Sequence, residues 1–336
     1  MRQSRVVALW SLFIALGGGV AAPIRSALAA DKLIGFHSAR TMSQAMPWIA
    51  EEAGLFRKYE LDFQLLYISS AQMVTAAMLG GDAQIAISGG EAIVRAVAQG
   101  ATDLVFIASA KNTLTHSIIG KPEIKRPQDL KGKRFGVSRL GSNSHYFVVQ
   151  ALRASGMEPS DVNFIQTGGQ VENLAALFSG AVDAATMTGP SGGARAVTQG
   201  FHFVVYGPDL RIPFTAAALI TRRSLLNSRG PAIEKFVRAT AEAMKIMFSD
   251  KELTYRVLAK QLRINDRKIL DAAYDEEIKA LEPRLEFKYE ALQAIIDETG
   301  KADPRVKKIK PQDLLDRRYL DGLQKSGFFD KLWAMK

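Results

Sequence analysis

Two stretches of fifteen residues decide the fold: YISSAQMVTAAMLGG at residues 67–81 and QTGGQVENLAALFSG at residues 166–180. Both begin with a short polar turn, continue into a segment rich in alanine, and end on glycine. Further along, AVAQG at residues 96–100 matches AVTQG at residues 196–200, again about 100 residues apart. Self-similarity at a fixed spacing is the signature of a repeated structural unit. The sequence therefore predicts two similar halves.

Each half is predicted to consist of strands that alternate with helices. A short β-rich run precedes the repeated helix, whose terminal glycine, Gly81 or Gly180, suits a left-handed cap. Two more β-type runs follow, separated by a second helix. Strands that alternate with helices favour parallel sheets. The expected strands are residues 61–68, 83–87 and 104–110 in the first half and residues 162–166, 182–187 and 203–206 in the second.

Two further β-type stretches, residues 115–120 and 215–221, lie where the chain is expected to cross between the halves. Two such crossings would form a hinge. After them, apolar residues recur at helical spacing. The expected C-terminal helices are residues 231–248, 253–262, 266–281 and 290–298. The predicted domains are a signal peptide at residues 1–29, a first lobe made of residues 31–116 and 218–336, and a second lobe inserted as residues 117–217.

The first thirty residues are typical of an export signal. Arg2 and Arg5 provide a positive start, residues 6–22 are apolar, and small residues precede a cleavage site that we expect near Ala29. The alternative is a membrane anchor, but glycine, proline and arginine interrupt the apolar run below the roughly 20 residues that a spanning helix needs. We therefore expect a periplasmic protein.

The composition excludes several classes of protein. The chain has no cysteine, so disulfides, thiol nucleophiles and cysteine-bound metals are excluded. The net charge of +10 falls to +7 if the three arginines of the signal are removed, and the basic residues are too scattered to predict nucleic acid as a partner. No phosphate-binding loop, nucleophile elbow, metal-binding helix pair or dinucleotide fingerprint is present. We expect a protein that is not an enzyme and that holds no cofactor or metal.

The loops that follow the expected strands are rich in glycine and small hydroxyl residues. In open α/β sheets, ligands bind beyond the carboxyl ends of the strands, next to helix N-termini. Such residues also serve as ordinary caps and turns, but their recurrence in both halves favours a site for a small anion or zwitterion. Arg40 is a candidate partner for an acidic group, and Phe36, Tyr146 and Phe214 are candidate walls. The loops are residues 36–41, 69–72, 88–91, 110–113, 139–144, 167–169, 188–190 and 207–209.

Several motifs resemble one family. PWIAEEAGLF at residues 47–56 and QDLKGKRFGV at residues 128–137 look like segments of the nitrate, sulfonate, taurine and thiamine-precursor group of periplasmic ABC-transporter solute-binding proteins. The likeness covers about residues 32–225. It implies a type II periplasmic-binding-protein fold: an α/β protein with two Rossmann-like lobes joined by two crossing strands, and a helical C-terminal tail on the first lobe.

The resemblance also implies a function and a site. The ligand would be a small molecule held between the lobes, the partner an ABC permease in the inner membrane, and the protein a monomer. Matching positions imply ligand contacts, to which the loop glycines at 141 and 168 are added because glycine permits close approach. The candidate ligand-binding residues are Ser38, Ala39, Arg40, Ser70, Ser88, Gly89, Asn112, Gly141, Ser142, Asn143, Gly168 and Thr188.

Other proteins of similar fold provide alternatives. A fungal pyrimidine synthase, with iron near a cysteine-rich motif, and porphobilinogen deaminase, with its cofactor on a cysteine, are disfavoured because this chain has no cysteine. A transcription regulator would need a DNA-binding helix pair where the export signal stands. An exported receptor that delivers its solute to a sensor or to a non-ABC carrier remains open.

Overall fold

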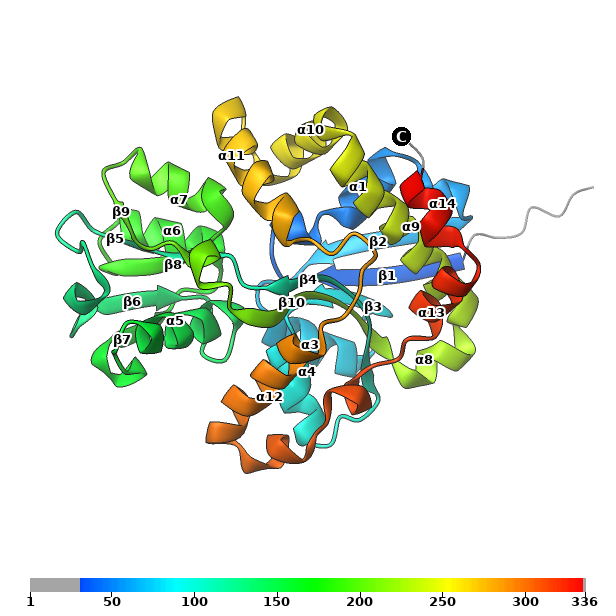
Figure 1. The fold of residues 1–336 in the computed structure, drawn as a ribbon, viewed down its shortest axis with the longest axis horizontal. Coiled ribbons are helices and arrows are strands. Elements are labelled where there is room, and N and C mark those ends of the chain that lie inside the picture. The colour runs from blue at the N-terminus through cyan, green and yellow to red at the C-terminus, as the bar shows by residue number, and fades with distance from the viewer. Residues whose placement is uncertain (1–30, 335–336) are drawn as a thin grey trace, which may run out of the picture. The chain divides into compact units, whose positions relative to one another are not determined.

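The computed structural model describes residues 31–334, without the side chains of residues 188–191 and 194. It contains two five-stranded sheets with helices packed around them (Figure 1). The first sheet has the spatial order β2 (Leu61–Tyr67), β1 (Asp31–His37), β3 (Ile85–Ser88), β10 (Pro213–Arg222) and β4 (Leu104–Thr113). The second has the order β7 (Asn163–Gln166), β6 (Arg134–Val137), β8 (Ala184–Thr188), β5 (His116–Gly120) and β9 (His202–Val205).

The two sheets repeat one strand order, and the predicted fold class is confirmed. We call the first sheet with its helices lobe one and the second lobe two. The chain passes from lobe one to lobe two between β4 and β5 and returns through β10. The expectation of purely parallel sheets is wrong at these crossings, because a strand arriving from the other lobe enters its sheet from the opposite end. Accordingly, β10 is antiparallel to β3 and β4, and β5 is antiparallel to β8 and β9.

Helices cover both sheets, and the predicted helical tail is confirmed. Lobe one contains α1 (Met46–Glu52), α2 (Leu55–Lys58), α3 (Ala71–Gly80) and α4 (Gly90–Ala98). Lobe two contains α5 (Asn143–Ala154), α6 (Gln170–Phe178) and α7 (Gly189–Val197). The tail comprises α8 (Arg223–Ser228), α9 (Gly230–Ser249), α10 (Lys251–Leu262), α11 (Arg267–Glu277), α12 (Tyr289–Ala302), α13 (Arg318–Lys325) and α14 (Phe328–Ala334). The signal predicted at residues 1–29 lies outside the described residues.

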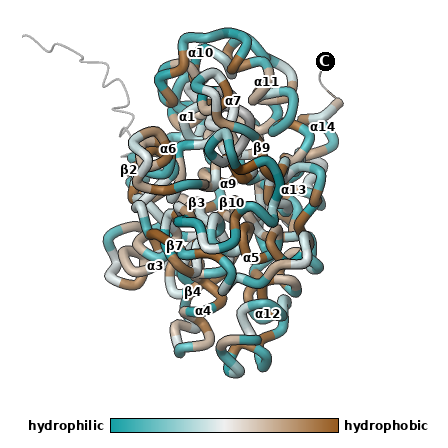
Figure 2. The backbone as a smooth tube through the Cα atoms, turned by 90° about the vertical axis from the view of Figure 1, so that its left-hand side faces the viewer, coloured by the Kyte–Doolittle hydropathy of each residue, from teal (hydrophilic) through white to brown (hydrophobic). Residues whose placement is uncertain are grey.

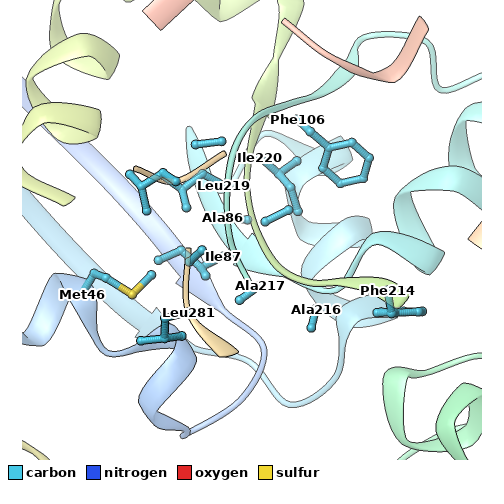
Figure 3. Close-up of a cluster of buried hydrophobic side chains, with 14 of the residues drawn as sticks. Met46, Ala86, Ile87, Phe106, Phe214, Ala216, Ala217, Leu219, Ile220 and Leu281 are labelled. Atoms are coloured by element: carbon cyan, nitrogen blue, oxygen red, sulfur yellow. The ribbon is translucent and has the colours of Figure 1, made fainter. Parts of the chain in front are cut away.

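The returning strand β10 runs through the core of lobe one. Leu219 and Ile220 are fully buried, as are Ile87 of β3 and Phe106 of β4 on the neighbouring strands (Figure 3). Full burial of one such side chain contributes about 1.5–3 kcal/mol to folding. Hydrophilic residues dominate the outer turns around α10, away from these strands (Figure 2). Burial of apolar surface therefore fixes the strand that joins the lobes.

Each lobe also holds its third strand in register with the same pair of hydrogen bonds. In lobe one, the amide of Gln84 donates to the carbonyl of Ile34 (2.9 Å), and the amide of Ile34 donates to Oε1 of Gln84 (2.8 Å). In lobe two, the amide of Asp183 donates to the carbonyl of Arg134 (2.8 Å), and the amide of Arg134 donates to Oδ2 of Asp183 (3.0 Å). The sequence repeat is thus also a repeat of hydrogen bonding.

Candidate functional site

A cavity of about 490 Å³ is lined by residues of both lobes. Lobe one provides the loops after β1 and β2 and the turn between α10 and α11, and lobe two provides the loops after β6 and β7 together with parts of β8 and α7. This volume suits a small-molecule ligand. Within residues 31–334, no group of three His, Asp or Glu side chains is arranged to hold a metal ion. None of the helices described there combines the length and apolarity that crossing a membrane requires.

Three helices begin at the cavity. Ser70, Ser142 and Gly169 are the N-cap residues of α3, α5 and α6, and all three line the cavity. The first turn of a helix exposes unpaired N–H groups and carries a partial positive charge. Three such ends at one cavity favour a negatively charged ligand.

Six of the twelve predicted site residues line the cavity: Ser38, Ala39, Arg40, Ser70, Ser142 and Asn143. Gln44, which the sequence analysis missed, shapes the first of these loops. Its Oε1 accepts from the amides of Ser38 (3.0 Å) and Ala39 (3.1 Å), and its Nε2 donates to Oγ of Ser38 (3.1 Å). One buried amide side chain therefore holds the loop after β1 open towards the cavity.

Five other predicted residues, Ser88, Gly89, Asn112, Gly141 and Gly168, are not among the described residues that line the cavity. Ser88 is fully buried, Nδ2 of Asn112 donates to the carbonyl of Glu286 (2.8 Å), and Gly141 makes a turn at a φ of 74°. Gly168 accepts a hydrogen bond from Ser69 across the lobes. The twelfth residue, Thr188, ends β8, and its side chain lies outside the described residues. That any of the twelve contacts a ligand stays a prediction.

Gly89 packs closely against Asn143, a residue of the cavity lining. A Cβ at this position would stand 1.8 Å from Oδ1 of Asn143, so only glycine allows the two residues to approach this closely. Asn143 in turn donates from Nδ2 to the carbonyl of Ala216 at 3.3 Å. Lobe two is thereby held against the end of lobe one at the base of the cavity.

The expected aromatic walls are wrong. Phe36, Tyr146 and Phe214 are buried in the core and are not among the described lining residues; Tyr146 and Phe214 pack against each other, with ring centroids 4.6 Å apart. Tyr67, at the end of β2, lines the cavity instead and carries the guanidinium of Arg40 over its ring at 4.9 Å. Position at the end of a strand, rather than aromaticity alone, is the signal that would have identified Tyr67.

Several buried polar atoms in the lining have no protein partner. They are Oγ of Ser70, Oδ1 of Asn143 and Nδ1 of His116. A buried polar group without a hydrogen bond costs about 1–3 kcal/mol, so such groups are rare unless a ligand or water satisfies them. Burial lowers the pKa of His116 to about 3, with a further contribution from nearby Lys111. The imidazole is therefore neutral at physiological pH and able to donate or accept.

Lys111 is the one basic side chain of the lining that is already neutralised. Its Nζ lies 2.8 Å from a carboxylate oxygen of Glu277 and also donates to the hydroxyl of Thr115 at 2.5 Å. Both charged side chains are almost completely buried. The pair joins β4 to the end of α11, so the helical tail forms part of the cavity wall.

Comparison with known proteins identifies the family. The family model described as NMT1/THI5 like matches residues 43–252, which is more than half of the chain. The chain belongs to the NMT1/THI5-like family. Among its relatives, the taurine-binding periplasmic protein of Escherichia coli (strain K12) is 28% identical over 127 residues, which are 37% of this chain and 37% of that protein. The match thus spans little more than a third of that relative's length.

Solved structures share the fold. The alkanesulfonate-binding protein SsuA from Xanthomonas axonopodis pv. citri, bound to MOPS, superposes with a TM-score of 0.72 at 17% identity, covering 86% of this chain and 98% of that one. The periplasmic aliphatic sulphonate binding protein SsuA from Escherichia coli superposes with a TM-score of 0.67 at 20% identity, covering 86% and 92%. Both are binding proteins.

In this NMT1/THI5-like protein, the sequence analysis missed two arginines in the lining. Arg195 lies on α7, and Arg263 lies in the turn between α10 and α11. Arg195 occupies the position of Arg95 about 100 residues earlier, but Arg95 is outside the described lining, so the repeat did not mark Arg195 as a site residue. No local signal marked Arg263, because nothing in the helical pattern of the tail shows which turn reaches the other lobe.

The lobes of this NMT1/THI5-like protein also contact each other outside the cavity. The hydroxyl of Tyr146 donates to the carbonyl of Ala294 (3.1 Å), and Nη1 of Arg153 lies 2.5 Å from Oε1 of Glu298. Both contacts join α5 to α12, and α7 contacts α11 on another part of the interface. The cavity is therefore enclosed by helices of the tail as well as by the two sheets.

Proposed function

We propose that this protein is the exported solute-binding component of an ABC importer and that its cargo is a small organic anion of the sulfonate type. One observation carries the proposal: a cavity shared by two lobes brings together three helix N-termini and basic side chains, and the lining residues that the structure describes include no Asp or Glu. A sulfonate presents three acceptor oxygens, which suit the N–H groups of helix N-termini and the surrounding hydroxyls.

The relatives support the same class of cargo. One is a taurine-binding periplasmic protein, and two solved structures of the same fold are sulfonate-binding proteins. We propose a periplasmic location for the mature protein on the same grounds, together with the export signal expected at residues 1–29.

The mechanism that we propose is closure around the solute. Residues 31–116 with 218–336 would move as one body and residues 117–217 as the other, with β4, β5 and β10 at the hinge. A solute that contacts Ser70 on one side and Asn143 on the other makes both sets of contacts only when the lobes are together, so binding favours the closed form. The permease would then recognise that form.

Isothermal titration calorimetry of the purified protein against alkane- and arylsulfonates tests the proposed function. We expect binding of at least one sulfonate, and about a tenfold loss on Asn143→Ala, because a hydrogen bond to a charged group contributes about 1.5–3 kcal/mol. Asn227→Ala is the matched control, since Asn227 is exposed on α8, far from the lining. Failure of every sulfonate to bind would contradict the proposal.

Transport requires its own test. Cells lacking the protein should lose uptake of the anion that calorimetry identifies, and a plasmid copy should restore it. Unchanged uptake, together with tight binding, would instead favour the alternative that the receptor serves a sensor.

A further inference from the structure

We propose that the cavity selects a ligand with two separated anionic groups on an apolar body and rejects zwitterions, with Arg195 and Arg263 receiving the second anionic group. This inference rests on the proposed function as an anion receptor and specifies its ligand. It departs from the taurine-like zwitterion that the sequence alone left open.

The cavity is lined by three arginines. Arg40, Arg195 and Arg263 line it, and within the described part of the chain none of the three has a carboxylate partner. Among the described residues of the lining there is no Asp or Glu, and the nearby Glu277 is already paired with Lys111. One carboxylate approaches the lining: Oε2 of Glu172 lies 2.6 Å from where a Cβ on Gly169 would stand. An ammonium group in this cavity would thus meet three guanidinium groups against one carboxylate at the margin, which disfavours a zwitterion by like-charge repulsion.

The three arginines carry more positive charge than a ligand with one anionic group can neutralise. A monoanion can neutralise one of the three arginines, and the others would stay uncompensated in a site that closes around its ligand. Arg40, Arg195 and Arg263 are exposed in the structure, so the cost of leaving one of them unpaired arises only as closure of the lobes removes it from water. A second anionic group on the ligand removes part of that cost, so a dianion fits this cavity better than a monoanion of the same shape.

The sequence repeat shows that Arg195 lacks the carboxylate partner that Arg95 has. In α4, Nη2 of Arg95 lies 2.8 Å from Oε1 of Glu91, one helical turn away. The equivalent positions in α7 are Arg195 and residue 191, which is serine. The copy of the arginine that lines the cavity is thus the copy whose helix lacks the carboxylate, and its charge is available to a ligand.

The backbone at Arg263 is a second, independent observation. Arg263 has a φ of 55° and a ψ of 46°, and its amide donates to the carbonyl of Ala259 to cap α10. This left-handed position normally holds glycine, because other residues are strained there. Of the five non-glycine residues with a positive φ in the described chain, Ser70 and Arg263 line the cavity. Strained backbone of this kind is kept mainly at functional sites, which supports a role for Arg263 in binding.

The apolar body of the ligand is indicated by the rest of the lining. Between the polar loops, the cavity is bounded by Leu114, Val171, Leu174, Met187, Leu262 and Ile264. These side chains come from both lobes and from the tail. They suit an aliphatic or aromatic spacer between two anionic ends, since apolar surface removed from water stabilises the complex.

Two series of sulfonates that differ only at the far end test the inference by calorimetry. The first is propanesulfonate, taurine and 3-sulfopropanoate, which end in a methyl, an ammonium and a carboxylate group. The second is 4-toluenesulfonate and 4-sulfobenzoate. In at least one series, we expect the carboxylate compound to bind about tenfold or more tightly than the methyl compound, because one charge-assisted hydrogen bond suffices for that ratio. Taurine should bind weakest of the first series.

Variants of Arg263 locate the second anionic group. Arg263→Gln should weaken binding of the carboxylate compound about tenfold and change binding of the methyl compound by less than about threefold. Arg256→Gln is the matched control, because it removes the same charge from α10 at an exposed position outside the lining. Arg263→Gly should reproduce the loss with an unchanged or higher melting temperature, which separates binding from folding.

The outcomes distinguish this inference from the proposed function. Methyl and carboxylate compounds of equal affinity in both series, or taurine as the tightest ligand, would overturn the inference and leave the anion receptor standing. Absence of binding by all five compounds would contradict both.

Discussion

The two lobes share a scaffold and differ in how they use charge. In each, the third strand is held by the same pair of hydrogen bonds, but lobe one uses the neutral Gln84 and lobe two the charged Asp183. The carboxylate of Asp183 also lies 2.6 Å from Nζ of Lys121 and 2.8 Å from Nη2 of Arg134, where the interior strands β6 and β8 begin. Lobe one instead has an almost completely buried ion pair, Lys111 with Glu277, beside the cavity.

The repeated loops differ where they face each other. Ser70 and Gly169 are equivalent positions of the repeat and are both N-caps at the cavity. Ser70 has a φ of 78°, whereas Gly169 is extended and a Cβ there would stand 2.9 Å from Oγ of Ser69. The two copies therefore share their strands and the hydrogen bonds that hold them. They differ at residues where one copy contacts the other, such as Ser70 and Gly169.

The buried ion pair gives the largest expected effect. Glu277→Ala should lower the free energy of unfolding by about 3–5 kcal/mol, because it leaves Lys111 charged and buried without a partner. Urea denaturation of the variant and the wild type measures the difference. The double variant Lys111→Met/Glu277→Leu should recover most of the loss. A cost below about 1 kcal/mol for Glu277→Ala would show that this lobe does not depend on its interior charges.

A smaller effect is expected at Asp183 of lobe two. Asp183→Asn replaces the charged side chain of this hydrogen-bond pair by a neutral amide, as in lobe one. It should lower the free energy of unfolding by about 1–2 kcal/mol at neutral pH, since it removes two charge-assisted contacts. Hydrogen bonds from Arg134 and Lys121 hold the pKa of Asp183 below its ordinary value. This stabilisation is therefore present above the unfolded-state pKa of about 4 and is lost as the pH falls further. Urea titrations at several pH values should show the two proteins converging in acid, and a constant difference would contradict this assignment.

The smallest expected effect concerns Ser70, the N-cap of α3, whose backbone has a positive φ. Ser70→Gly, which copies the residue of lobe two, should raise the free energy of unfolding by about 0.5–1 kcal/mol, because glycine adopts a positive φ without steric cost. The same change should weaken anion binding, since it removes a hydroxyl whose oxygen faces the cavity without a protein partner. Thermal unfolding and calorimetry on the same sample test both. A variant that is less stable and binds equally well would contradict the strain argument.

Much of the fold was predictable because it rests on local and periodic signals. The repeat of residues 67–81 at 166–180 predicted two α/β lobes, and the three-to-four spacing after residue 230 predicted the helical tail. The direction of β5 and β10 was not predictable in the same way. It depends on the path of the chain between the lobes, which no local pattern records.

The candidate site was predictable only in part. Ser38, Arg40, Ser70 and Asn143 follow strands or lie at the starts of helices, and all four line the cavity. Ser88 and Asn112 have the same local features, yet they are buried, because neighbouring elements cover them. Covering is a property of packing between distant segments, so residue type and position along the chain could not separate the two groups.

The sequence by itself determined the duplicated strand and helix order, the chemistry of the loops and the absence of cysteine, because each of these follows from residue identity and spacing. Only the tertiary structure decided that Arg195 and Arg263 meet at one cavity and that Lys111 is already neutralised by Glu277. Those facts depend on which of many charged residues are brought together across 68 to 166 positions of chain. The interaction between two charges depends on the distance between them, and for residues far apart in the sequence that distance is set only when the lobes and the tail pack together.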